Sequence, residues 1–100
     1  MLNTDYKNET LTVYLGGELD HNRAADIRVS IDSNISSLRP KLLNLDFSNV
    51  SFMDSSGIGL IMGRYRSMAL VGGELRVVNI PPALSKIIEL SGVRSLGVLG

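Results

Sequence analysis

The most constraining feature of this chain is a strand pattern that leads through a polar turn into a helix pattern. Residues 42–47 form an almost continuous apolar run, which is typical of a strand covered on both faces. Polar residues and glycines follow over 51–59. Apolar side chains then recur at helical spacing: Ile58, Ile61, Met62, Tyr65, Met68 and Ala69. A buried strand that feeds an amphipathic helix predicts an α/β fold.

Similar patterns precede this unit. Residues 2–7 and 10–17 are rich in strand-forming side chains and predict a β-hairpin. Asp20 is a favoured N-cap for the helix that follows, which Arg39-Pro40 stops. That helix is indicated by apolar residues at three- and four-residue steps: Ala24, Ile27, Ile31, Ile35 and Leu38.

Further elements are expected after the turn. The second helix should span about 56–71 and end at Gly72-Gly73, and residues 74–80 predict another strand. A short helix is expected to open at Pro81-Pro82, with Leu84, Ile87 and Ile88 on its apolar face and Gly92 at its end. Residues 93–99 are expected to form a last short strand. The order predicts one domain over 1–100, with a largely parallel sheet, an N-terminal antiparallel hairpin and flanking helices.

Composition narrows the functional classes. Ten basic and ten acidic residues balance, which gives no electrostatic reason to expect nucleic acid or an anionic membrane as a partner. The chain has no cysteine and one histidine, so thiolate and multi-histidine metal sites are excluded, and no cofactor is expected. It has no apolar run of spanning length and no signal-peptide pattern at its start, so we expect a cytoplasmic protein.

The turn at Asp54, Ser55 and Ser56 supports two interpretations. Aspartate and serine are favoured helix N-caps, and the turn needs no further role. Alternatively, a serine at a helix start is a plausible phosphorylation site, because the helix dipole offsets part of the added charge. The glycines that follow, Gly57 and Gly59, have a similar pair of interpretations: close packing on the sheet, or a bare surface for a partner.

The segment Gly17 to His21 is the second candidate site. Asp20 is expected by residue type to cap the next helix, whereas Glu18 and His21 are expected to face solvent. Loops that follow parallel strands meet at one edge of a sheet. Glu18 and Asp20 are therefore expected to share one surface with the Ser55 turn.

Intrinsic catalysis is not expected. His21 is the one available base, and no nucleophile-elbow glycine pattern surrounds Ser55. On the second helix Tyr65 fits the apolar face, and Arg64 and Arg66 are expected on a solvated face.

Several segments together resemble a known family, the STAS family of bacterial anti-sigma factor antagonists, and most of all its sporulation members. The segments are Gly17-Glu18-Leu19-Asp20-His21, Leu45-Asp46, Ser51-Phe52-Met53-Asp54-Ser55-Ser56-Gly57-Ile58-Gly59, Gly63-Arg64-Tyr65, Gly72-Gly73-Glu74 and Leu90-Ser91-Gly92.

The resemblance implies that Ser55 is the phosphoacceptor. It implies a partner that is both an anti-sigma factor and an ATP-dependent serine kinase. The unphosphorylated antagonist would bind this kinase and release a sporulation sigma factor, phosphorylation would end the binding, and a serine phosphatase would restore it. The expected partner-binding residues are Glu18, Asp20, His21, Asp54, Ser56, Gly57, Ile58 and Gly59.

The chain departs from the family pattern at its end. Members usually continue into a further C-terminal helix, whereas this chain stops at 98–100, so that helix is missing or cut off. A second possibility within the family is an antagonist or scaffold of a general-stress or other signalling pathway.

Overall fold

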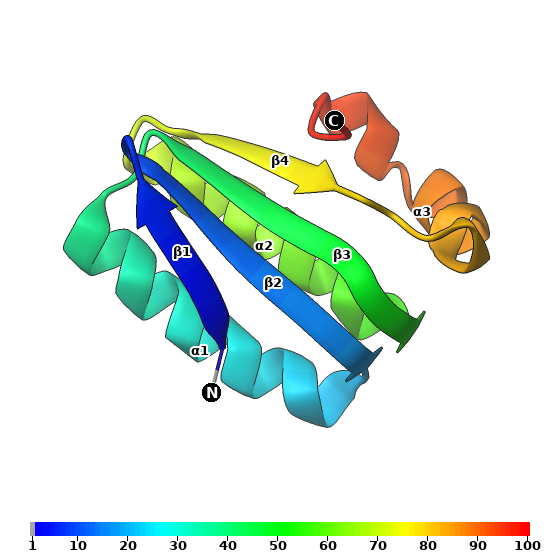
Figure 1. Cartoon of the computed structure of the whole chain (residues 1–100). Coiled ribbons are helices and arrows are strands. Elements are labelled where there is room, and N and C mark those ends of the chain that lie inside the picture. The colour runs from blue at the N-terminus through cyan, green and yellow to red at the C-terminus, as the bar shows by residue number, and fades with distance from the viewer. Residues whose placement is uncertain (1) are drawn as a thin grey trace.

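A four-stranded mixed sheet forms the centre of the fold in the computed structural model, which describes residues 2–100 (Figure 1). The strands lie in the order β1-β2-β3-β4. Their bounds are β1 (Asn3–Lys7), β2 (Thr10–Leu19), β3 (Leu42–Met53) and β4 (Glu74–Val78). β1 pairs antiparallel with β2, and β2, β3 and β4 pair in parallel. The predicted α/β fold with an N-terminal hairpin is confirmed.

Two long helices, α1 (His21–Leu38) and α2 (Ser55–Leu70), pack beside each other on one face of the sheet (Figure 1). The core lies between these helices and the inward side chains of the strands. Its fully buried members include Leu11, Val13, Leu43, Leu45 and Phe47 from the sheet and Ile31, Ile61 and Met68 from the helices. Burial of this apolar surface is the main stabilising contribution to the fold.

The expectation that residues 42–47 are covered on both faces by other elements is wrong. Leu43, Leu45 and Phe47 face the helices, whereas Leu42 and Asn44, on the other face, are half-buried. The reason is topological. β2, β3 and β4 follow one another in order across the sheet, so two right-handed crossovers place both helices on the same side.

The buried face of α2 also differs from the prediction. Arg64 is buried, whereas Tyr65 and Ala69 are exposed. Adjacent helical residues lie about 100° apart, and here the helix is rotated so that Gly57, Ile61, Arg64 and Met68 face inward.

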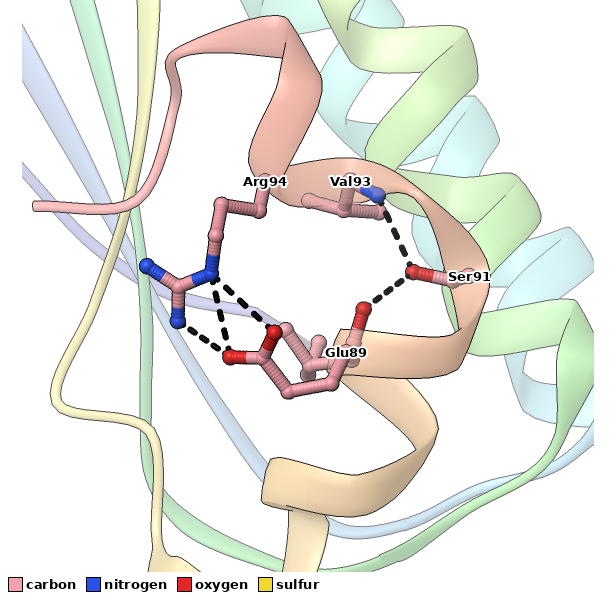
Figure 2. Close-up of polar contacts among 5 residues, drawn as sticks. Glu89, Ser91, Val93 and Arg94 are labelled. Atoms are coloured by element: carbon pink, nitrogen blue, oxygen red, sulfur yellow. Dashed lines mark hydrogen bonds and ion pairs between the residues drawn. The ribbon is translucent and has the colours of Figure 1, made fainter.

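After β4 the chain forms a one-turn 3₁₀ helix, η1 (Pro82–Leu84), then α3 (Ser85–Ser91), and then a second 3₁₀ helix, η2 (Val93–Leu96). The short helix is confirmed, but the strand expected over 93–99 is wrong. Gly92, with φ 82°, reverses the chain. The Ser91 hydroxyl accepts a hydrogen bond from the Val93 N–H at 3.2 Å and donates one to the Ile88 carbonyl at 2.6 Å (Figure 2).

An ion pair between Glu89 and Arg94 braces the same turn (Figure 2). The hydrogen bond from Arg94 lowers the pKa of Glu89, and the same bond raises the pKa of Arg94. These local bonds favour a compact turn, and pairing with β4 is reduced to an isolated bridge between Val77 and Leu99.

Candidate functional site

The candidate phosphorylation site lies where β3 meets α2. β3 runs on to Met53, and Asp54 caps α2 by accepting a hydrogen bond from the Ser56 N–H at 2.8 Å. The capping interpretation of Asp54 is therefore confirmed. Ser55 is the first residue of α2 and is exposed. Its hydroxyl stands at the positive end of the helix dipole, and the cap is supplied by its neighbour.

The loop between β2 and α1 adjoins this turn, as expected. Leu19 pairs with Met53 across the two strands, and the Asp54 N–H donates a hydrogen bond to the Leu19 carbonyl at 3.4 Å. Asp20 caps α1 by accepting a bond from the Arg23 N–H at 3.0 Å. Two helix starts, each capped by an aspartate, therefore lie next to each other at one edge of the sheet.

The remaining predicted partner-binding residues differ in exposure. Glu18 and His21 are exposed, as is Gly59. Ser56 is half-buried, whereas Gly57 and Ile58 are buried. A protein that covered Ser55 would meet the exposed members first.

The two glycines that begin α2 have different roles. A Cβ at Gly57 would lie 2.7 Å from Cγ and Sδ of Met53, so this glycine allows the helix to pack closely on β3. A Cβ at Gly59 would meet no atom within 4 Å among residues 2–100. Close packing therefore explains the glycine at position 57, whereas Gly59 lies on an uncovered surface.

Arg23 was not identified from the sequence. Its Nη1 donates hydrogen bonds to the carbonyls of Gly16 at 2.6 Å and Glu18 at 2.7 Å. The pairing register between β2 and β3 shifts twice here, once between Tyr14 and Gly16 and once between Gly17 and Glu18. Gly17 has φ 70°. A Cβ on Gly17 would lie 3.0 Å from Nη1. The adjacent glycines at the end of a strand pattern were the available signal for this irregular strand end.

A groove of about 250 Å³ runs between the first turns of α1 and α2. Its lining combines small, polar and apolar residues: His21, Ala24, Ala25, Arg28, Ser56, Gly59 and Leu60. The groove continues the exposed surface from Ser55 along the two helices.

Asp46 fastens β3 to the end of β4 on the open face of the sheet. Its Oδ1 accepts hydrogen bonds from the Ser48 N–H at 2.9 Å and the Ser48 hydroxyl at 2.7 Å, and its Oδ2 accepts one from Asn79 Nδ2 at 2.8 Å. Burial raises the pKa of Asp46, but the bonds from Ser48 and Asn79 outweigh it, so the pKa lies below its ordinary value.

A buried arginine links the two long helices. Arg64 Nε lies 3.0 Å from Asp32 Oδ1, and the Ser67 hydroxyl donates to the same oxygen at 3.2 Å. The Arg64 Nε–Asp32 contact is an ion pair without hydrogen-bond geometry, and Nη1 of Arg64 makes no hydrogen bond within the part of the chain described. Burial lowers the pKa of Arg64, and Asp32 opposes this. The expectation that Arg64 lies on a solvated face is wrong.

Over residues 2–100 there is no group of three or more His, Cys, Asp or Glu side chains that could hold a metal ion. None of the helices described there is long and apolar enough to cross a membrane.

Comparison with known proteins gives concordant matches. A family model described as the STAS domain matches residues 1–97. An anti-sigma F factor antagonist of Paenibacillus polymyxa is 35% identical over 89 residues, which make up 89% of this chain and 76% of that protein.

Two solved structures share the fold. The anti-sigma factor antagonist SpoIIAA in its unphosphorylated form has a TM-score of 0.86 at 32% identity, over 100% of this chain and 86% of that one. The Bacillus cell fate determinant SpoIIAA in the phosphorylated form has a TM-score of 0.77 at 32% identity, over 100% of this chain and 89% of that one.

Proposed function

This chain belongs to the STAS domain family, among the anti-sigma factor antagonists of the SpoIIAA type, and we propose that it is a phosphorylation-switched antagonist in sporulation. Its unphosphorylated form binds an anti-sigma factor that is also a serine kinase and that holds ATP or ADP. Binding releases a sporulation sigma factor. The kinase phosphorylates Ser55 and ends the binding, and a serine phosphatase restores it, all in the cytoplasm.

The observation that carries the proposal is the position of Ser55. It is exposed, it begins a helix that Asp54 already caps, and Glu18 at the end of β2 and Asp20 directly after β2 lie on the adjoining segment. A phosphate there would add about −1.5 to −2 charges to a surface that is already acidic. A partner surface that fits the unmodified loop would then face an unpaired charge, which is costly to desolvate. Two further facts favour this assignment: a structural neighbour is known in both an unphosphorylated and a phosphorylated form, and the curated relative is an anti-sigma F factor antagonist.

The first test maps the phosphate. Incubation with an anti-sigma F factor and ATP should add one phosphate to the wild-type chain and to Ser56→Ala, and none to Ser55→Ala. Mass spectrometry of the intact protein and its peptides gives the answer. Phosphate retained by Ser55→Ala would contradict the choice of serine.

The second test concerns binding. Ser55→Ala should bind the kinase with ADP as the wild type does, because the cap on α2 comes from Asp54. Ser55→Asp should bind more weakly, by a factor of several, because a carboxylate reproduces part of the phosphate charge. Calorimetry measures both affinities. Equal affinities for the two variants would rule out an electrostatic switch.

The same binding assay separates sporulation from general-stress pathways. The chain is expected to bind an anti-sigma F factor more tightly than an anti-sigma-B factor. The opposite order would favour the stress pathway instead.

A further inference from the structure

We propose that an apolar patch beside the Ser55 turn is a second contact surface for the same kinase. The patch consists of Phe52, Ala83, Ile87 and Leu90, and it borders a groove of about 360 Å³ between the end of β3 and α3. The inference rests on the proposed function and extends the expected interface to a side of the turn that the sequence did not indicate.

The patch is exposed to an unusual degree for its composition. Phe52 is 50% exposed and Leu90 is 79% exposed. Neither residue is used by the core, because Met53 on β3 and Leu84 and Ile88 around α3 take the buried positions. Clustered apolar side chains of this kind on a small domain mark an interaction surface more often than isolated ones do.

Strand and helix periodicity place these side chains together. Phe52 alternates with the core residue Met53, so it points to the open face of the sheet. Ala83, Ile87 and Leu90 follow at four- and three-residue steps, and all three line the same groove. Figure 1 shows α3 beyond the end of β4, at the end of the sheet to which the parallel strands point.

The patch is continuous with the predicted interface. Phe52 is the direct cross-strand partner of Glu18, and it stands three residues before Ser55. The Ser55 turn therefore has an acidic loop on its β2 side and an apolar patch on its α3 side.

The area that a stable interface requires also supports the kinase as the partner that covers this patch. A standard complex buries about 800 Å² on each partner, which corresponds to a region roughly 30 Å across. The whole molecule measures 32 × 29 × 19 Å. A protein seated on Ser55 must therefore extend well beyond the turn, and the adjoining apolar surface is the one it would desolvate most favourably.

The composition of the patch indicates the chemistry of the partner surface. Aromatic side chains, phenylalanine among them, are enriched in protein–protein interfaces relative to the rest of the surface. Lys86 borders the groove, whereas Glu18 and Asp20 lie on the other side of Ser55. The kinase surface should therefore present apolar side chains opposite Phe52 and Leu90, an acidic group opposite Lys86, and basic groups opposite the β2 loop.

Leu90→Ser and Phe52→Ser test the proposal, with Leu70→Ser as the matched control. Leu70 is 86% exposed and lies at the C-terminal end of α2, away from the Ser55 turn. Calorimetry with a purified anti-sigma F factor and ADP should show affinity reduced roughly tenfold or more for Leu90→Ser and for Phe52→Ser. Leu70→Ser should bind within about twofold of the wild type, and thermal melts should show all three variants folded.

The outcomes are distinguishable. If Leu90→Ser and Phe52→Ser bind the kinase as tightly as the wild type does, this inference is overturned and the proposed function stands. Equal weakening by Leu70→Ser also overturns it. A further outcome is sedimentation in which the wild type is a dimer and Leu90→Ser a monomer. That result would assign the patch to a second copy of the chain and overturn the kinase as its partner. A wild-type chain that binds no anti-sigma F factor overturns the proposed function and the inference together.

Discussion

The Asp46 carboxylate accepts two hydrogen bonds from Ser48 on its own strand and one from Asn79 just after β4, and its contribution to stability should depend on pH. Its pKa is lower in the folded protein than the ordinary 3.8, so its contribution is fully present above that value and is lost as the pH falls through the folded-state pKa. Asp46→Asn should lower the free energy of unfolding by about 1–3 kcal/mol at pH 7. The difference from the wild type should shrink toward pH 3.

Urea unfolding of the two proteins at pH 7, 5 and 3 measures this difference. Ser48→Ala, which removes one of the three donors, should give a smaller loss with the same pH trend. A difference between wild type and Asp46→Asn that stayed constant down to pH 3 would show that the ionised carboxylate is not the stabilising species.

Single residues also show how far sequence reasoning reached. Asp20 and Asp54 could be recognised as caps because the signal is local: an aspartate stands directly before a helix pattern. Arg64 could not be placed, because its burial depends on Asp32, which another helix supplies. Residue type favoured burial of its neighbour Tyr65, because aromatic residues are buried more often than charged ones.

At the scale of elements, Arg23 joins α1 to the last residues of β2 and so positions the acidic residues Glu18 and Asp20. Arg23→Ala should loosen residues 16–20 and weaken kinase binding several-fold, with a loss in stability of about 1–2 kcal/mol for the two charge-assisted bonds. Arg23→Lys should recover part of the affinity, because an ammonium group can still donate to a carbonyl.

Backbone amide spectra and calorimetry check this expectation. Shifts should concentrate at residues 16–20, and Arg66→Ala, an exposed arginine on α2, should change neither the spectra there nor the affinity. Unchanged binding by Arg23→Ala would mean that the contacts of Arg23 with the end of β2 do not position this segment for the partner.

The elements themselves were predictable to different degrees. Their order and the hairpin followed from alternation and helical periods. The extension of β3 to Met53 did not, because polar residues interrupt its second half and its pairing with β2 is not visible in a local pattern. Val93 to Leu96 look like a strand by composition, but Gly92 and the bonds of Ser91 favour a turn.

At the scale of the whole molecule, phosphorylation of Ser55 should change binding with little change in the fold. A negative charge at a helix start is favourable by about 0.3–1 kcal/mol, and Asp54 beside it opposes this by a similar amount. The melting temperatures of the phosphorylated and free chains should therefore agree within a few degrees. Amide shifts should be confined to the Ser55 turn and its adjoining loop.

Thermal melts and amide spectra of both forms test this, with phosphatase-treated protein as the control. A large melting shift, or amide changes spread through the sheet, would mean that the switch works by refolding.

The juxtaposition of the two loops followed from topology, since consecutive parallel strands bring their carboxyl ends to one edge. The apolar patch could not be predicted from topology, because it brings Phe52 beside α3. The position of α3 depends on tertiary packing of Leu84 and Ile88.

The cap on α2 comes from Asp54, and the Ser55 hydroxyl is not part of it. A phosphate on Ser55 would then require no rearrangement of the backbone, and the switch would have no conformational rate of its own. The time for which the antagonist stays inactive would equal the lifetime of one phosphoester bond. The rates of the kinase and the phosphatase would set the timing of the switch. The state of this small domain would depend only on which of the two enzymes acted on it last.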